Sequence, residues 1–328
     1  MRKITLASIV LGAFGVFALP PSPAHALVFG TWVSGAGSDL NDCSIHTPCR
    51  QITKALADTS AGGVINVLPG EYQGVLVDKA VDIIADQGMA TIAGSSSPFG
   101  GTFFAGIYVN AGPSDVVHIR GMIVDQPGIS WAGILFASGA ALHVENCTLV
   151  GTGTGGPAAL HFAPTSAASG GVPTELSVRN STISNNPAGN VLIKPSAGVA
   201  VAVLIENTLI AEGPFGIRAD DSDGSGMIRV NVRNSNAKGN SNNGFLAVGT
   251  GASPIHFMID HSAAENNGVN GAIATGAQAF MIVTNSTLMG NGTGLAQQSS
   301  ATVASTGTNT INFNTTNTSG TITPIAPK

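Results

Sequence analysis

Three carboxylates lie within four residues of one loop, in the segment RADDSDGSG at 218–226. They belong to Asp220, Asp221 and Asp223. Carboxylate oxygens are the ligands that Ca²⁺ prefers, so the loop is a candidate calcium site. The same letters are also ordinary turn chemistry, in which Asp bonds the local backbone and Gly accepts a positive φ. No Glu follows at the distance that an EF-hand requires, so both interpretations stay open.

Three basic side chains occupy short apolar segments before this loop or at its start. His161 lies in LHF, Lys194 in LIKP and Arg218 in GIRAD, and all three are expected to point outward from strands. A calcium ion would neutralise a uronate carboxylate while one of these groups removed the adjacent proton. The set predicts β-elimination on an acidic polysaccharide, with calcium as the cofactor that this chemistry suggests.

A motif that returns about every 25 residues defines the strands that must position these side chains. Its copies are VHIRG (117–121), LHVEN (142–146), LSVRN (176–180), VLIEN (203–207), VNVRN (230–234), FMIDH (257–261) and MIVTN (281–285). The residues two and four places before the final turn residue are apolar in every copy. Alternate residues of a strand share a face, so each copy predicts a half-buried strand. A unit this small cannot bury its apolar face alone, and the units must stack.

The residue before the turn alternates in charge through six successive copies. It is Arg120, Glu145, Arg179, Glu206, Arg233, Asp260 and finally Thr284. Parallel strands lie ~4.8 Å apart, and opposite charges that face each other stabilise the pair by up to ~1 kcal/mol. This column predicts a charge ladder that fixes the stacking register, and we do not interpret it as an active site.

The turn residue is Asn in most copies, and we expect its amide to bond the amide of the next coil. His261 replaces Asn in one copy, where a ring nitrogen would make the same bond. Farther back in the motif, His118 and His143 share one column. Two exposed histidines on adjacent coils are either ordinary surface residues or a transition-metal pair.

Three short strands per repeat predict an all-β chain, wound as a single-stranded parallel β-helix of about 9–10 coils over residues 62–310. An N-terminal segment, 27–61, contains RQITKALAD (50–58). This stretch predicts a short amphipathic helix with Ile52, Ala55 and Leu56 inward, which covers the open edge of the first coil. Residues 311–328 are expected to form a C-terminal tail.

The first 26 residues have the features of a secretory signal peptide. These features are Arg2 and Lys3, an apolar run from Ile4 to Leu19, and the small-x-small site Ala24-His25-Ala26. No later run approaches the ~20 apolar residues that a membrane span requires. We therefore expect a secreted protein that does not span a membrane, extracellular or periplasmic, cleaved near Ala26.

Export places the cysteines in an oxidising compartment, which favours a disulfide between Cys43 and Cys49. Cys147 is left over, and we expect it to be a small buried hydrophobe. The chain has 18 acidic residues against 13 basic ones and no basic block, so nucleic acid is not expected as a partner. It has only two Trp and two Tyr for stacking on sugars, and none recurs in the repeat.

The capping helix, the segment GGVINVLPGEY (62–72) and the xLxVxN coils resemble the right-handed parallel β-helix superfamily that includes pectate lyases and polygalacturonases. TWVSGAGSDLNDCSIHTPC (31–49) ahead of such a helix resembles exported bacterial members. The resemblance implies the fold, and that fold serves lyases, hydrolases, epimerases, tailspikes and surface proteins. The acidic, Gly-His-Gly and Arg-x-Lys signatures of polygalacturonases are missing from this sequence. Only the acidic loop beside Arg218 comes near the calcium site of a lyase.

Three functional hypotheses follow. The first, which the missing signatures favour, is a non-enzymatic secreted β-helix that binds a polysaccharide, a cell-surface glycan or a protein. The alternative is a calcium-dependent, pectate-lyase-like enzyme that acts on acidic glycans through His161, Lys194 and Arg218. The third is a module that stacks end to end in a larger assembly.

Overall fold

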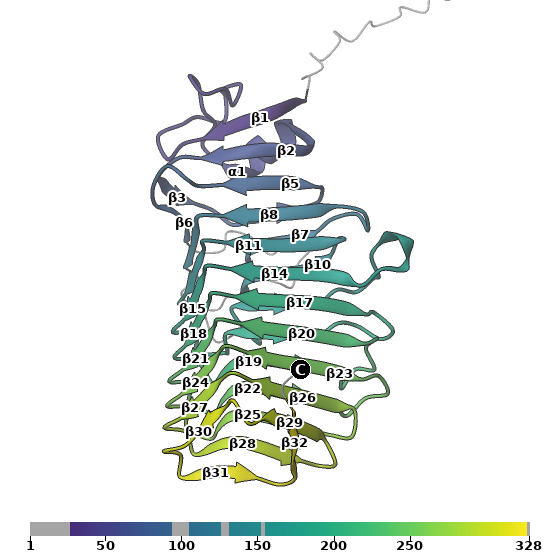
Figure 1. Cartoon of the computed structure of the whole chain (residues 1–328). Helices are drawn as coiled ribbons and strands as arrows, with labels where there is room; N and C mark the ends of the chain where they lie inside the picture. The colour runs from purple at the N-terminus through teal and green to yellow at the C-terminus, as the bar shows by residue number, and fades with distance from the viewer. Residues whose placement is uncertain (1–26, 94–104, 126–130, 152–154, 327–328) are drawn as a thin grey trace, which may run out of the picture.

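The computed structural model describes residues 27–93, 105–125, 131–151 and 155–326. The predicted signal peptide lies outside these residues. The chain winds into a stack of coils whose short strands form three parallel sheets (Figure 1). The purple N-terminal strands and the yellow C-terminal strands lie at opposite ends of the stack. The predicted parallel β-helix is confirmed.

Each complete coil contributes one strand to each sheet, in the order sheet 1, sheet 2, sheet 3, and sheet 1 has an additional strand at each end, β1 and β32. Sheet 1 contains β1 (Val28–Val33), β2 (Thr59–Val67), β5 (Val81–Ile84), β8 (Val116–Arg120), β11 (Ala141–Glu145), β14 (Thr174–Arg179), β17 (Val201–Glu206), β20 (Ile228–Arg233), β23 (Ile255–Asp260), β26 (Ala279–Thr284), β29 (Thr302–Thr306) and β32 (Ile322–Ile325). Sheet 2 contains β3 (Gly70–Tyr72), β6 (Ala90–Ala93), β9 (Met122–Asp125), β12 (Thr148–Val150), β15 (Thr182–Ser184), β18 (Leu209–Ala211), β21 (Asn236–Lys238), β24 (Ala263–Glu265), β27 (Thr287–Met289) and β30 (Thr310–Ile311). Sheet 3 contains β4 (Val75–Val77), β7 (Ala105–Asn110), β10 (Ala132–Ser138), β13 (Leu160–Phe162), β16 (Val191–Ile193), β19 (Phe215–Asp220), β22 (Asn243–Val248), β25 (Asn270–Thr275), β28 (Thr293–Gln298) and β31 (Thr316–Ser319). A helix, α1 (Ile52–Asp58), and a 3₁₀ turn, η1 (Ser169–Gly171), complete the secondary structure of the described residues.

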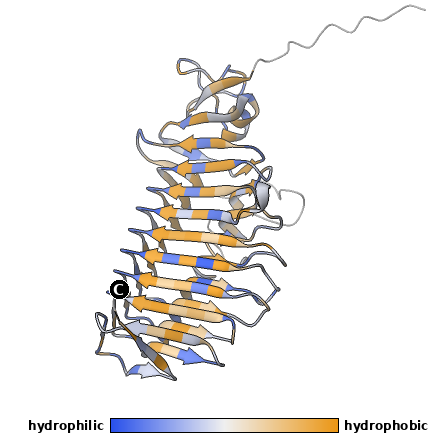
Figure 2. Cartoon of the chain, turned by 45° about the vertical axis from the view of Figure 1, so that its right-hand side comes forward, coloured by the Kyte–Doolittle hydropathy of each residue, from blue (hydrophilic) through white to orange (hydrophobic). Residues whose placement is uncertain are grey.

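The two apolar columns of the repeat lie inside the coil, as the alternation predicted. Ile205 and Val232, for example, are 0% exposed. Equivalent residues of successive coils lie directly above one another, since Ile205 pairs with Val232 and Val232 with Ile259 in the strand register. Hydrophobic residues are concentrated in the strands and hydrophilic ones at the turns (Figure 2). The core is therefore one continuous column shared by all coils.

The charge ladder of sheet 1 is also confirmed in register. Glu145 pairs with Arg120 on one side and Arg179 on the other. Glu206 likewise lies between Arg179 and Arg233, with Asp260 next in line. One contact in this file is close enough to be an ion pair, between Arg179 Nε and Glu206 Oε2 at 3.6 Å. The other residues of the file lie farther apart, as exposed side chains do.

The prediction that the turn Asn residues form the main amide ladder is wrong. Their side chains are exposed, and their backbone is left-handed, with φ of 52° at Asn146 and 48° at Asn234. Asn tolerates this conformation because its short polar side chain can bond locally. Among the described residues, one amide bond joins two of them, from Asn207 Nδ2 to Asn180 Oδ1 at 3.3 Å. His261 follows the same rule, with φ of 45°, and its Nδ1 contacts Asp260 instead of the next coil.

The buried polar ladders lie elsewhere in the coil. The residue after each turn Asn points inward. The hydroxyls of Ser181, Ser235, Ser262 and Ser286 each accept a backbone N–H from the preceding coil, as Ser262 Oγ does from Ser235 N at 3.2 Å. A buried amide ladder occupies the second turn, between sheets 2 and 3. It consists of Asn186, Asn190, Asn240, Asn267, Asn291 and Asn314, each of which donates to the next at 2.9–3.0 Å. These ladders satisfy the amide and hydroxyl groups that the turns bury.

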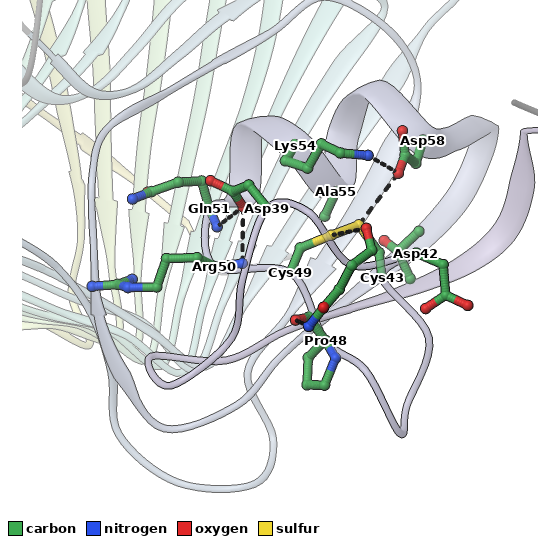
Figure 3. The surroundings of a disulfide bond; sticks show 12 residues. Asp39, Asp42, Cys43, Pro48, Cys49, Arg50, Gln51, Lys54, Ala55 and Asp58 are labelled. Atoms are coloured by element: carbon green, nitrogen blue, oxygen red, sulfur yellow. Dashed lines mark hydrogen bonds and ion pairs between the residues drawn. A yellow bond between two sulfur atoms is a disulfide. The ribbon is translucent and has the colours of Figure 1, made fainter. Parts of the chain in front are cut away.

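The N-terminal end is closed by α1 and a disulfide-bonded loop. Cys43 and Cys49 form the predicted disulfide, with their Cα atoms 4.6 Å apart (Figure 3). The carboxylate of Asp39 accepts the backbone N–H groups of Arg50 and Gln51 at 2.9 Å, just before the helix begins. The helix buries Ile52, Ala55 and Leu56, as its amphipathic pattern predicted.

At the other end, strands continue beyond residue 310, since β31 and β32 pair with β28 and β29.

Cys147 is 2% exposed, and burial raises the pKa of its thiol to about 11, which fits the predicted unreactive core residue. Within the described ranges, no helix combines the length and hydrophobicity needed to cross a membrane.

Candidate functional site

A groove of about 830 Å³ runs over the outer face of sheet 1. Its lining residues come from six consecutive strands, β11 to β26, so it extends ~24 Å along the axis of the stack at ~4.8 Å per strand. The groove follows the outward residues of these strands, which point away from the core in three parallel columns. It therefore suits an elongated ligand that lies across the strands.

Strand β20 crosses the middle of this groove and supplies its strongest polar groups. Arg229, Asn231 and Arg233 alternate with buried Val230 and Val232, so all three point outward from one strand. Residues i and i+4 of a strand lie ~13 Å apart, so the two guanidinium groups flank the central amide. Of the seven arginines in the sequence, three line the groove, including Arg179.

The two arginines of β20 are not neutralised by the protein. Neither Arg229 nor Arg233 has an ion-pair partner within 4.0 Å among the described residues. Asp260 is next to Arg233 in register, but its carboxylate contacts His261 Nδ1 at 2.8 Å and Asn285 Nδ2 at 3.1 Å. Burial alone would raise the pKa of Asp260, but these hydrogen bonds and the charges of His261 and Arg233 lower it overall.

The middle column of the groove combines polar and apolar groups. It reads Ser177, Leu204, Asn231, Met258 and Ile282 in consecutive strands. Met258 and Ile282 are 37% and 40% exposed, which is high for large apolar side chains. The amide oxygen of Asn231 is buried and has no hydrogen-bond partner. An unpaired buried acceptor costs free energy, and a ligand hydroxyl or amide could satisfy it.

The residues that the sequence suggested for catalysis lie on sheet 3, far from this column. Arg218 and Asp220 point outward from β19, and Arg218 Nη2 donates to Asp220 Oδ2 at 2.5 Å. Asp220 is 2% exposed, and its second oxygen accepts the N–H of Ser222 at 2.9 Å. Burial alone would raise the pKa of Asp220, but the hydrogen bonds of Ser222 and the charge of Arg218 lower it overall.

The other two carboxylates of the loop have different partners. Asp221 is 0% exposed, and its Oδ1 accepts the N–H groups of Thr250 and Gly251, in the following coil, at 2.7 and 2.8 Å. Asp223 is exposed and lies 3.2 Å from Lys194 Nζ. The carboxylates of Asp220, Asp221 and Asp223 thus turn to three separate partners, and their oxygens do not come together within 4.8 Å as a group. Calcium binding by this loop stays a prediction.

His161 is separated from the acidic loop. It pairs in register with Leu192, which in turn pairs with Arg218, so His161 and Arg218 lie two strands apart, at ~10 Å. Both ring nitrogens of His161 are buried without a hydrogen-bond partner. Burial and then the charge of Lys194 lower its pKa to about 4, so the ring is neutral at pH 7. The structure brings Arg218 to Asp220 and Lys194 to Asp223, but it does not bring His161 to either pair.

The one group of three metal-type ligand atoms that the described residues bring within 4.8 Å is Cys43, Cys49 and Asp58. Both sulfurs are joined in the disulfide, and a metal would need thiolates, so this group is structural (Figure 3). Asp58 also forms an ion pair with Lys54 of the same helix.

Sequence reasoning missed the groove residues Arg229 and Asn231, and it assigned Arg233 to the charge ladder alone. They lie in the motif copy IRVNVR, where polar residues alternate with the apolar columns. The signal was present, because Arg229 and Arg233 place two positive charges on the same outward face of one strand. This signal was overlooked because the copies of the repeated motif were compared only at the position before the turn, which contains Arg233 but not Arg229.

Comparisons with known proteins address the fold. No family model and no curated protein matches this chain. A solved rhamnogalacturonan lyase is similar with a TM-score of 0.55 and 16% identity, over 84% of this chain and 75% of that one. The pectate lyase Pel9A is similar with a TM-score of 0.43 and 15% identity, over 93% and 80% of the two chains. With three continuous parallel sheets and the first of these similarities, the chain has the right-handed parallel β-helix fold.

Proposed function

We propose that this protein is an exported, non-enzymatic β-helix that binds an acidic glycan along the groove of sheet 1. The observation that supports it most directly is strand β20, which presents two unpaired arginines on either side of an unpartnered amide oxygen. The guanidinium group is planar and forms paired hydrogen bonds with carboxylates, so a uronate is a suitable ligand.

The charge of the groove favours an anionic ligand. Its lining contains three arginines and one glutamate, Glu175, although Arg179 is paired with Glu206 and the whole chain has a net charge of −5. A local excess of positive charge on an acidic protein attracts anions over short range without promoting general binding to polyanions. This distribution supports recognition of spaced carboxylates.

The groove floor favours a sugar chain over a uniformly polar anion. Sugar rings have hydroxyl edges and apolar C–H faces. Asn231 and Ser177 offer hydrogen-bonding groups, while Leu204 and Met258 in the same column offer apolar contact. The length of the groove across six strands suits an extended polymer more than a compact ligand.

Export is part of this proposal. The predicted signal peptide, from Arg2 to Ala26, supports it, and so does the disulfide between Cys43 and Cys49, because disulfides persist in oxidising compartments. We expect the mature protein outside the cytoplasm to begin at Leu27, which N-terminal sequencing would check. A mature chain that begins at Met1 would contradict export.

The alternative is a polysaccharide lyase at Arg218, Lys194 and His161, with calcium held by Asp220, Asp221 and Asp223. One observation favours it, since two cationic side chains lie on adjacent strands beside the acidic loop. Against it, each cation is already paired with a carboxylate of that loop. A free base and an open metal site would require both pairs to break.

Binding should be measured by calorimetry on polygalacturonate and alginate, with neutral dextran as the glycan control. We expect the wild-type chain to bind an acidic glycan and the double variant Arg229→Ala/Arg233→Ala to bind more than ~10-fold more weakly, because each hydrogen bond to a charged group contributes about 1.5–3 kcal/mol. Arg218→Ala on sheet 3 is the matched control and should bind normally. No binding to any acidic glycan, or equal binding by the double variant, would sink the proposal.

Two further arms separate the alternatives. Equal affinity for poly-glutamate would indicate a protein ligand instead of a glycan. A calcium-dependent rise in ultraviolet absorbance from unsaturated uronate products, lost in Arg218→Ala, would establish the lyase. We expect a flat absorbance trace with every glycan.

A further inference from the structure

Two histidines stack on the outer face of sheet 1, at the N-terminal end of the groove. His118 on β8 and His143 on β11 are direct partners in the parallel register, as their shared column predicted. Their ring centroids are 4.5 Å apart, with an angle of 40° between the ring planes. Within the described part of the chain, neither ring has a hydrogen-bond partner. His118 is exposed and His143 is half-buried, and their four ring nitrogens lie close together without hydrogen-bond partners among the described residues.

Carboxylates flank this pair on both sides. Asp82 on β5 pairs in register with His118. Glu175 on β14 pairs with Ala141, two residues before His143 on the same strand. Burial and then the charge of His118 lower the pKa of His143, and Arg179 acts in the same direction, whereas Glu175 and Asp82 oppose it. A metal binds the neutral imidazole, whose unprotonated nitrogen has the lone pair that coordination requires.

We propose that His118 and His143 bind one divalent transition-metal ion of the Zn²⁺, Ni²⁺ and Cu²⁺ class, with the carboxylate of Glu175 or Asp82 as an additional ligand. Imidazole is a preferred ligand of these ions, at about 2.0–2.1 Å from metal to nitrogen. Two rings on adjacent strands can each turn to present one nitrogen to a common ion. No group of three ligand atoms is already within 4.8 Å here, so a carboxylate must swing in to complete the set.

This site overlaps the N-terminal end of the groove, because His143 and Glu175 belong to the groove lining. Its other candidate ligands, His118 on β8 and Asp82 on β5, lie outside the groove, and the site does not use the arginines of β20. It also differs from the acidic loop of sheet 3 in chemistry, because nitrogen ligands select transition metals while clustered carboxylates select calcium.

The test is calorimetric titration of the full-length chain with Zn²⁺ and Ni²⁺, after chelator treatment and without a histidine tag. We expect one ion per chain, and a loss of more than ~10-fold in affinity for His118→Ala and for His143→Ala, since even outer-shell partners of a metal contribute about 10–100-fold. His256→Ala is the matched control, because His256 also points outward from sheet 1 but faces Arg229 and Phe280. Circular dichroism confirms that each variant is folded.

The outcomes separate cleanly. The proposal is overturned if the wild-type chain binds neither ion, if both histidine variants bind normally, or if His256→Ala loses as much affinity as they do. Glu175→Gln and Asp82→Asn test the third ligand, and a loss of affinity in one of them assigns it. Unchanged affinity in both would overturn the carboxylate assignment. Arg229→Ala/Arg233→Ala should bind the metal normally, which distinguishes this result from the glycan experiment.

Discussion

Strands β19 and β20 belong to neighbouring segments of the chain and place arginine in the same local pattern with opposite results. On β19, Arg218 is followed two residues later by Asp220, and the two side chains form an ion pair. On β20, Arg229 is followed two residues later by Asn231, and the guanidinium group has no ion-pair partner among the described residues. The carboxylate of Asp220 neutralises Arg218 on β19. The amide of Asn231, at the equivalent place on β20, leaves the charge of Arg229 free to attract an anion.

The charged groups of sheet 3 show that a cluster of acids and bases is not by itself a functional site. A cluster of acids and bases invites a catalytic interpretation, yet the groups on sheet 3 satisfy one another. Ion pairs of this kind are common structural features, and perturbed pKa values follow from them without any catalytic role. Arg229 and Arg233 of sheet 1 are less conspicuous in the sequence. They have no ion-pair partner among the described residues, and they line a groove.

The largest expected effect is on the sheet 3 side, at Asp221. Asp221→Ala removes the acceptor of two backbone N–H groups in the following coil, and we expect a loss of about 2–4 kcal/mol in the free energy of unfolding. Asp223→Ala is the control, since an exposed ion pair contributes about 0–1 kcal/mol. Denaturant titration followed by circular dichroism measures both. Equal midpoints for the two variants would mean that Asp221 is not a structural anchor.

Asn231→Asp should turn the pattern of β20 into that of β19. The new carboxylate would pair with Arg229 and repel a uronate, so we expect affinity for an acidic glycan to fall about 10-fold or more, at ~1.5–3 kcal/mol for a hydrogen bond to a charged group. Asn231→Leu is the control for lost polarity alone, and it should leave stability unchanged or slightly improved. Calorimetry on polygalacturonate measures the affinity. Unaltered binding in Asn231→Asp would remove β20 from the proposed site.

The pH dependence of stability distinguishes the ion pair of β19 from free arginines. The pKa of Asp220 is lowered from its ordinary value of 3.8, so its ionised form stabilises the folded chain above that value, and this contribution is lost as the pH falls through the lowered pKa. We expect Asp220→Asn to be less stable than wild type by ~1 kcal/mol near pH 7, discounted for the partly exposed Arg218. The two unfolding curves should converge in acid. A constant difference at every pH would show that the carboxylate charge is not involved.

The smallest effect is expected in the charge ladder beside the groove. Arg179→Glu would place three acids in a row, with Glu145 and Glu206 on either side, and should cost up to ~1 kcal/mol. Arg179→Gln should cost less, and added salt should shrink the difference, because exposed charges are screened. Unfolding midpoints at two salt concentrations check this. A salt-independent cost would point to lost packing instead of charge.

The fold could be predicted from the sequence because every coil repeats one physical constraint. Ile205, Val232 and Ile259 each need an interior, and their equal spacing from a turn residue fixed the register of sheet 1. The alternating charges then agreed with that register. Such consistency between local pattern and stacking is what makes a repeat architecture readable.

The sequence pattern did not predict which turn residues form the buried polar ladders, and the reason lies in the turns themselves. Period-two alternation stops at a turn, so the pattern does not tell whether Asn207 or Thr208 points inward. The left-handed backbone of Asn207, with φ of 49°, turns its side chain outward and leaves Thr208 buried. The groove was missed for a different reason. It joins outward residues such as Leu204 and Asn231, which come from separate coils and gain meaning only side by side.

The amides buried between sheets 2 and 3 have one consequence for the stack as a whole. From Asn186 to Asn291, each side chain donates to the next amide toward the C-terminal end, so the bonds between the amides all point the same way. Hydrogen bonds in a chain polarise one another, by about 10–30% per bond. Each amide bond added at the C-terminal end therefore strengthens the amide bonds before it. Loss of one amide in the middle of the ladder weakens the bonds on both sides of it.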